Sequence, residues 1–404
     1  MSRVMLVCPE PLGHGQPAGI GIRFVEIARA LRSDGHAITV LSPDAGKLEG
    51  CAAEYINPDT LRATSNASDV AIVQGHVANA FFLQASTIPT VVDLYDPYII
   101  ENLHYFAERG AEVFQHDHFT LMNSLVRGDY FLCASEAQRQ FYLGLLLACG
   151  RLNPQLFESD PRLESLIGIA PFGVQSPRAE KPRDLDAPAI LFGGIYDWYD
   201  PVLAIDAVAI ARQSLPGATL TFTHHPNPEL TPQGQLAAAM QHAKKHDYDF
   251  VRFEPWAAYE QRAEFFEQFA IALLTFPRSI ETDLSMRTRV YDYLWCGLPI
   301  VTSSAPGTDE ILERYSAGAV VHEESADAFA KELVSILRVR ERYAQLARGA
   351  YDFVRDHQWD RTLAPLRAFC ASPRFEKTKE TFASRPGIPE RSATFMERLR
   401  RKLR

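Results

Sequence analysis

The side chains best placed to do chemistry lie in one late stretch, residues 281–301, ETDLSMRTRVYDYLWCGLPIV. An apolar run at 270–276, ended by Pro277, precedes it and predicts a buried strand. In a parallel sheet, the loop that follows a strand lies at the carboxyl edge, where ligands bind. The charges that this stretch brings to that edge are Glu281, Asp283, Arg287, Arg289 and Asp292.

One helix is expected to position these charges. Ser285 is a suitable N-cap, and the spacing of apolar residues predicts a helix over 286–296. Gly297 suits the position just after a helix, and Pro299 prevents its continuation before a strand at 300–302. The unit therefore reads strand, loop, helix, strand, with both arginines in the first turn of the helix.

Two further candidates follow strands of the first half of the chain. His76 comes shortly after the predicted strand 69–73, and Asp96 comes after 90–94. Either side chain could serve as a general base for an acceptor hydroxyl. A histidine at this place can also be structural, and an aspartate before Pro97 can simply form a turn.

In the second half, a strand at 189–194 ends in two glycines, which would let a ligand approach Gly194 closely. Tyr196 and Trp198 follow on the same loop and could stack on a base or a sugar. The alternative is that these aromatic side chains pack against the domain face.

Composition limits the class of protein. The chain has 404 residues, a formal net charge of −9 and 47% hydrophobic residues, as expected for about two globular domains without a general affinity for nucleic acid. Its six cysteines are scattered without a CxxC motif, which is typical of reduced thiols in a cytoplasmic protein. The sequence predicts neither a signal peptide nor a membrane span.

Strands alternate with helices in both halves, which predicts doubly wound parallel α/β domains. A long loop rich in glycine and proline, 9–21, follows the first strand, and its Gly19 could let backbone N–H groups approach a phosphate or a sugar. The expected domains are 1–175 and 189–357, joined by a polar, proline-rich linker at 176–188.

The end of the chain is expected to differ from the rest. Residues 358–370 are predicted as a terminal helix that crosses back to the first domain, and 371–404 form a basic tail. The end of the tail, 395–404, can form a short basic helix with apolar residues on one side. It is either a solvated end or a segment attracted to an anionic membrane surface.

Taken in order, several segments resemble the GT-B glycosyltransferases, especially the retaining group known as family four. The resemblance covers about residues 1–370. The segments that carry it are PAGIGIRFVEIARALRSDGHAITVL at 17–41, IAPFGV at 169–174, ILFGGIYDWYDP at 190–201 and DYLWCGLPIV at 292–301. It implies a GT-B fold, with two Rossmann-like domains facing across a cleft, and a nucleotide-sugar donor.

The family's Glu-x7-Glu motif is altered in this chain. Asp292 falls at the second acid, which in the family binds the donor ribose, and Leu284 falls at the first, so that Glu281 or Asp283 would have to supply that carboxylate. The basic pair that the family uses for the donor diphosphate is absent after the strand 189–194. We expect Arg287 and Arg289 to replace it, although Arg289 could instead pair with Asp292.

The sequence thus predicts a metal-independent, hexosyltransferase-type enzyme that transfers a sugar to a glycan or lipid-linked acceptor, without a cofactor. By resemblance, the reaction retains configuration and belongs to surface polysaccharide or glycoconjugate biosynthesis. The catalytic candidates are His76, Asp96 and Glu281. The donor-binding candidates are Gly19, Gly194, Tyr196, Trp198, Asp283, Arg287, Arg289 and Asp292. The alternatives are a GT-B nucleotide-sugar epimerase and a non-catalytic GT-B scaffold.

The tail hypothesis, with a cytoplasmic protein peripheral on the inner face of the membrane, has a direct test. Deleting residues 388–404 is expected to release the protein from anionic vesicles in a sedimentation assay, because several basic charges leave with the segment. A full-length protein that never binds such vesicles would contradict it.

Overall fold

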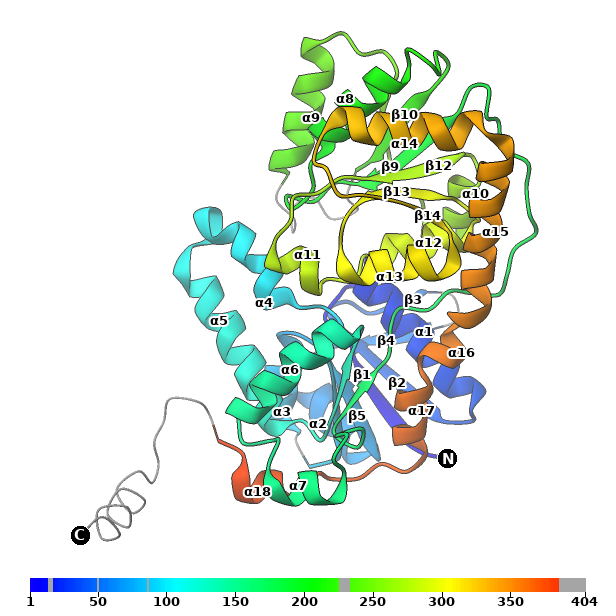
Figure 1. Cartoon of the computed structure of the whole chain (residues 1–404). Helices are drawn as coiled ribbons and strands as arrows, with labels where there is room; N and C mark the ends of the chain where they lie inside the picture. Colours follow the sequence, from blue (N-terminus) through cyan, green and yellow to red (C-terminus); the bar gives the residue numbers. More distant parts are fainter. Residues whose placement is uncertain (14–16, 49–50, 86, 225–232, 385–404) are drawn as a thin grey trace.

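The computed structural model describes residues 1–13, 17–48, 51–85, 87–224 and 233–384, and it places their strands in two sheets (Figure 1). The first sheet has the strand order β3-β4-β2-β1-β5-β6-β7-β8, and the second has β11-β10-β9-β12-β13-β14. Among the described strands, every pairing is parallel except that of β3 with β4. The expectation of two parallel α/β domains is therefore confirmed.

The strands of the first sheet are β1 (Arg3–Val7), β2 (Ala37–Ser42), β3 (Gly46–Leu48), β4 (Cys51–Tyr55), β5 (Val70–Val73), β6 (Thr90–Asp93), β7 (Tyr130–Cys133) and β8 (Ile167–Ile169). Those of the second are β9 (Ala189–Gly194), β10 (Thr219–Thr223), β11 (Val251–Glu254), β12 (Ile271–Leu274), β13 (Ile300–Ser303) and β14 (Gly318–Val321). Most are short apolar runs buried on both faces, as central parallel strands require. The edge strand β3 and its neighbour β4 lack such a run and were not predicted.

The helices of the first domain are α1 (Gly19–Ser33), α2 (Pro58–Asn66), α3 (Val77–Gln84), α4 (Tyr98–Glu101), η1 (Asn102–Tyr105), α5 (Phe106–Arg127), α6 (Glu136–Ala148) and α7 (Pro154–Ser159). The second domain has α8 (Pro201–Ala211), α9 (Gly234–Lys245), η2 (Tyr259–Gln261), α10 (Arg262–Phe266), α11 (Ile280–Leu284), α12 (Thr288–Trp295), α13 (Pro306–Tyr315), α14 (Ala326–Arg338) and α15 (Arg340–Asp356). The chain continues through α16 (Trp359–Thr362), α17 (Ala364–Ala371) and α18 (Lys379–Phe382).

The helical region 98–127 is interrupted twice. A 3-10 turn, η1, separates α4 from α5, and Gly110 within α5 has a φ of 70° that a helix does not allow. Glycine reaches this left-handed value without a steric penalty, so the break coincides with the one residue that tolerates it. The region therefore begins with the separate short helix α4, whose residues Tyr98 and Glu101 line the cavity described below.

The two domains share a continuous apolar contact where the chain returns to the first domain. The ring of Phe172 packs 5.9 Å from Tyr291 and 4.6 Å from Trp359, centroid to centroid. Beside it, the Val174 N–H donates to the His357 carbonyl at 2.7 Å. Gly173 is required here, because a Cβ atom would lie 2.5 Å from the Trp359 indole.

Helices α16 and α17 run back along the first domain (Figure 1). Phe369 stacks on Tyr130 with centroids 4.9 Å apart, and Ser2 donates a hydrogen bond to the Cys370 carbonyl. Arg367 forms an ion pair with Asp34, with Nε 2.6 Å from the carboxylate. Helices α16 and α17 are thus attached to the first domain, although α15, which precedes them in the chain, belongs to the second.

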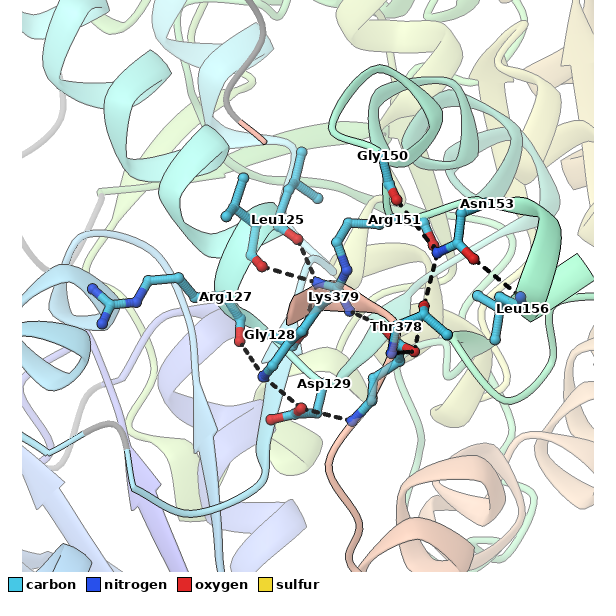
Figure 2. A network of polar contacts seen from close by, with 12 residues as sticks. Leu125, Arg127, Gly128, Asp129, Gly150, Arg151, Asn153, Leu156, Thr378 and Lys379 are labelled. Atoms are coloured by element: carbon cyan, nitrogen blue, oxygen red, sulfur yellow. Dashed lines mark hydrogen bonds and ion pairs between the residues drawn. The ribbon is translucent and has the colours of Figure 1, made fainter. Parts of the chain in front are cut away.

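Beyond α17, residues 373–384 form a strap over the first domain, and Figure 2 shows its polar contacts. The buried Arg151 guanidinium donates to the carbonyls of Leu125 and Gly128, each at 2.7 Å, and lies 3.1 Å from the Glu376 carboxylate. Lys379 pairs with Asp129 at 2.6 Å. Residues 385–404 of the basic tail lie outside the described residues, so its membrane binding stays a prediction.

The strap gives a stability prediction. Arg151→Met removes the partner of a buried carboxylate and of two carbonyl groups, and we expect the free energy of unfolding to fall by roughly 3–5 kcal/mol. Denaturant titration measures this value. The control is Arg162→Met, which removes an arginine whose side chain is 84% exposed and should leave the midpoint unchanged. Equal effects of the two substitutions would contradict the role of the buried network.

Candidate functional site

A cavity of about 500 Å³ lies between the two domains. Its walls come from the loops that follow β1, β5 and β6 of the first sheet, and β9, β11 and β12 of the second. The carboxyl edges of both sheets therefore face the same space, as the parallel topology requires.

The cavity brings most of the predicted residues together and leaves two outside. Gly19, His76, Asp96, Gly194, Tyr196, Trp198, Arg287, Arg289 and Asp292 line it. Glu281 is buried behind the wall, and the side chain of Asp283 is 39% exposed, 4.0 Å from the Arg278 guanidinium. The functional assignments of all these residues stay predictions, and their positions define the site described below.

The helix predicted over 286–296 is present as α12 but begins two residues later, and the N-cap role predicted for Ser285 is wrong. Ser279 caps α11 by accepting a hydrogen bond from the Thr282 N–H, and Ser285 ends α11 with extended backbone rather than starting a helix. The next helix, α12, begins only at Thr288. The first domain supplies the reason, because Gln138 donates to the Leu284 carbonyl at 2.9 Å and Tyr95 donates to the Met286 carbonyl at 3.2 Å.

A buried ion pair spans this break. Both nitrogens at the end of Arg287 donate to the two oxygens of Glu281, at 2.6 and 2.7 Å, and both residues are more than 90% buried. The guanidinium also lies over the rings of Tyr199 and Phe276. Because Glu281 neutralises its charge, Arg287 contributes to the shape of the cavity wall more than to the electrostatic potential in the cavity.

Arg289 differs from Arg287 in its electrostatic surroundings. Its guanidinium donates to the carbonyls of Gly194 and, at 3.4 Å, Phe192, and it lies 4.5 Å from the centroid of the Tyr199 ring. Within the described residues it has no carboxylate partner. The alternative of a pair with Asp292 is not realised, since Asp292 lies 3.4 Å from Arg262. An uncompensated positive charge therefore faces the cavity at the start of α12.

Asp292 belongs to a network that joins the domains. Arg262 lies between it and the ring of Tyr259, whose centroid is 4.0 Å from the guanidinium carbon, and the Tyr259 hydroxyl donates to Glu26 of α1. Burial raises the pKa of the Asp292 carboxyl, while Arg262 opposes the shift. Arg262 was not predicted, because Asp292, the carboxylate that it pairs with, lies 30 residues away in the chain.

The glycine loop after β1 is held by a carboxylate that the sequence analysis did not single out. Glu10 accepts from the N–H groups of Ala18 at 3.1 Å and Gly21 at 2.9 Å. Burial raises the pKa of Glu10 to about 7. Gly19 meets the second domain, because a Cβ atom there would lie 3.0 Å from the Thr288 methyl group. Only a small residue fits at this contact.

The aromatic loop after β9 forms another wall. Tyr196 stacks on Trp198 at 4.8 Å with an interplanar angle of 10°. Trp198 is only 9% exposed and packs near the Tyr105 ring of the first domain, at 6.2 Å. The rings pack on the interface, as the alternative expected, and they also line the cavity, while their stacking on a base or a sugar stays a prediction.

Carboxyl and imidazole groups gather on the side of the first domain. Asp96 hydrogen-bonds to Glu101, which accepts a hydrogen bond from Ser285 at 3.1 Å. Loss of water raises the pKa of Asp96 to about 6 and that of Glu101 well above its ordinary value. Partial desolvation, with His116 nearby, lowers the pKa of His76, so this imidazole is neutral at pH 7. Glu101 was not predicted, because its partner Ser285 is distant in the chain.

Two properties of the described residues bear on other kinds of site. No group of three or more His, Cys, Asp or Glu side chains among them is arranged to hold a metal ion. No helix in the described ranges is long and apolar enough to cross a membrane. Independence from metal and the location in the cell stay predictions.

Comparison with known proteins identifies the fold. A family model described as glycosyl transferase-like matches residues 224–368. A search of curated protein sequences finds no significant match. Among solved structures, sucrose-phosphate synthase from Thermosynechococcus elongatus aligns with a TM-score of 0.64 and 13% identity over 92% of this chain and all of that one.

Two further structures show the same likeness. HepE of Anabaena, in complex with UDP and glucose, has a TM-score of 0.67 and 15% identity over 93% of this chain and all of its own. The pneumococcal O-GlcNAc transferase GtfA, in complex with UDP and GlcNAc, has a TM-score of 0.53 and 14% identity over 79% of this chain and 60% of its own. The expectation of a GT-B fold is therefore confirmed.

Proposed function

We propose that this protein is a glycosyltransferase that moves a sugar from a nucleotide-sugar donor to a glycan or lipid-linked acceptor. The observation that carries the proposal is the Arg289 guanidinium, which lines the interdomain cavity without a carboxylate partner among the described residues. A cation held in place at the start of a helix fits a leaving diphosphate, whose negative charge grows as the sugar departs.

The donor would lie mainly on the second domain. Arg289 and the first turn of α12 would bind the diphosphate, with Gly194 and Gly19 allowing close approach of the backbone. Asp292 would bind the ribose, as the family resemblance implies. Tyr196 and Trp198 would contact the base or the sugar. UDP is the first nucleotide to test, because HepE and GtfA were crystallised with it.

The acceptor would lie on the first domain, near His76 and Asp96. A bond forms between the acceptor oxygen and the anomeric carbon, while the bond from that carbon to the diphosphate oxygen breaks and its electron pair leaves on the diphosphate. In an inverting reaction the hydroxyl proton passes to Asp96 or His76. In a retaining reaction, which the family resemblance favours, it passes to the leaving diphosphate.

The remaining assignments belong to the same proposal. Glu281 acts through Arg287, because both of its oxygens are bound by that guanidinium. Transfer of a hexose without a metal rests on the use of arginine for the diphosphate. A cytoplasmic place in surface polysaccharide or glycoconjugate assembly, peripheral to the membrane, rests on the family resemblance and the basic tail. Between an enzyme and a scaffold, the open cavity around Arg289 and Asp292 favours the enzyme.

The test of the function is a thermal-shift screen against nucleoside diphosphates and nucleotide sugars, followed by an assay of diphosphate release. A donor present at about 100 times its Kd stabilises the folded state by about 2.7 kcal/mol, which raises the melting temperature measurably. Release that requires an added acceptor identifies a transferase, whereas release without one and with isomerised sugar identifies an epimerase. No shift with any nucleotide would contradict the proposal.

The diphosphate site gives a prediction at one residue. Arg289→Ala should weaken the affinity for the nucleoside diphosphate by about tenfold or more, because a charge-assisted contact to phosphate is lost. Titration calorimetry measures this change. Arg278→Ala is the matched control, since Arg278 is 78% exposed and lies outside the cavity wall. Unchanged affinity in Arg289→Ala would remove Arg289 from the site.

A further inference from the structure

One buried side chain in the cavity wall lacks hydrogen-bond partners. Gln74 follows β5, is 1% exposed and lines the cavity. Within the described residues, neither its amide nitrogen nor its amide oxygen has a partner. Leaving such a group unsatisfied is costly, and native structures keep few of them. The two free atoms provide a donor and an acceptor side by side.

A second feature lies at the end of the neighbouring strand. β5 and β6 pair in parallel with Val73 opposite Val92, so Gln74 and the loop with Asp96 leave the same edge of the sheet. Asp96 and Glu101 are joined by a hydrogen bond, and both line the cavity. In the described part of the chain, neither has a cation partner within ion-pair distance.

The ionisable groups that the structure describes around this pair do not provide it with an unpaired cation. The ionisable groups that face it are Glu10, Asp93, Tyr98, Tyr142, Glu281 and Arg287. Asp93 is paired with Arg23 at 2.6 Å, and Glu281 is paired with Arg287 at 2.6 Å. The phenols of Tyr95 and Tyr196, also nearby, keep raised pKa values and stay neutral.

Two carboxyl groups in contact cannot both ionise easily without a cation, so they retain one proton between them. The raised pKa values fit Glu101 as the neutral partner at pH 7, leaving Asp96 ionised. A neutral Glu101 can accept from Ser285 of the second domain and donate to Asp96. The pair thus forms a hydrogen-bond chain from the second domain to the cavity.

We propose that Gln74 and the Asp96–Glu101 pair form the acceptor-sugar subsite, in which Asp96 receives the hydrogen bond of the attacking hydroxyl. The Gln74 amide binds a neighbouring donor and acceptor of the same sugar, from either a vicinal diol or an acetamido group. Glu101 is a positioning residue, since it acts through Asp96 by holding the shared proton. The subsite rests on the proposed transferase function and adds residues to it that the sequence did not indicate.

The first experiment compares pH profiles of diphosphate release for the wild type, Glu101→Gln and Asp96→Asn. It uses the best donor of the thermal-shift screen, with methyl glycosides as acceptor probes. In the wild type, kcat/KM should fall as the pH falls through about 6, where Asp96 is protonated, and fall again at high pH when Glu101 loses its proton. Glutamine mimics the neutral acid, so Glu101→Gln should keep most of the activity and lose the alkaline fall.

Asp96→Asn should lower kcat/KM and lose its fall near pH 6, because an amide does not ionise, and Glu112→Gln, on an exposed part of α5, is the control that should match the wild type. An alkaline fall that is the same in Glu101→Gln and the wild type would overturn the role of Glu101.

An infrared difference spectrum of the unliganded proteins at pH 7 tests for the shared proton without depending on enzyme activity. The carbonyl band of protonated carboxylic acids should be weaker in Glu101→Gln than in the wild type by the contribution of one group, since Glu10 contributes equally to both proteins, and equal bands would overturn the shared proton.

The second experiment uses Gln74→Leu, which keeps the size of the side chain and removes both unpaired atoms. The melting temperature should rise by about 1–3 °C, because an unsatisfied buried amide is gone. The acceptor KM should rise roughly three- to tenfold with the donor KM unchanged. Gln140→Leu, on the surface helix α6, is the control for both readouts.

The outcomes separate the two proposals. A lower melting temperature, or an unchanged acceptor KM, would overturn the role of Gln74. Comparing glucosides with N-acetylglucosaminides as acceptor probes shows whether the Gln74 amide binds a diol or an acetamido group. If the wild type releases diphosphate from no nucleotide sugar, the proposed function fails, while the melting temperature and the infrared band still decide whether the subsite has the predicted properties.

Discussion

The buried ion pair between Glu281 and Arg287 is the contact on which the geometry of the cleft depends. It closes the bend between α11 and α12 and neutralises two charges that would be costly to bury alone. Because the chain bends there, the carbonyls of Leu284 and Met286 are free to accept hydrogen bonds from the first domain. The same bend starts α12 at Thr288, which brings Arg289 to the cavity.

Across the cleft, the two domains present opposite charges. The second domain offers the Arg289 guanidinium, and the first offers the Asp96–Glu101 pair, each without an ion-pair partner among the described residues. Such a polarity suits a reaction in which negative charge grows on the leaving group and a hydroxyl must be made nucleophilic on the other side. The interdomain contacts of Tyr259 with Glu26 and of Glu101 with Ser285 hold the two sides in register.

Much of the fold could be predicted from the sequence, because central parallel strands are apolar runs that stand out from their surroundings. The strand-end positions of His76, Asp96 and Gly194 followed from the same pattern, and the cavity does bring these residues together. The edge strand β3 and its neighbour β4 lack this signal. Ser285 looked like an N-cap because local sequence does not show that distant side chains bind the nearby carbonyls.

The parts of the site that escaped prediction share a physical cause. Arg262 and Glu101 take their roles from Asp292 and Ser285, which tertiary folding brings close, and Glu10 takes its role from the way its own loop folds back on it. The importance of Gln74 lies in the contacts that it lacks, which only a three-dimensional structure can display. Among the charges of residues 281–301, Arg289 stands out from Arg287 only once Glu281 is seen to bind the latter.

The central claim is that the cleft binds a nucleoside diphosphate through the start of α12. Hydrogen–deuterium exchange with and without saturating UDP tests it directly, since bound phosphate protects the backbone amides that contact it. The account predicts slower exchange in residues 17–21, 193–199 and 286–292, with no change in α7 or α18 on the far side of the first domain. Protection confined to other segments at saturating UDP would contradict it.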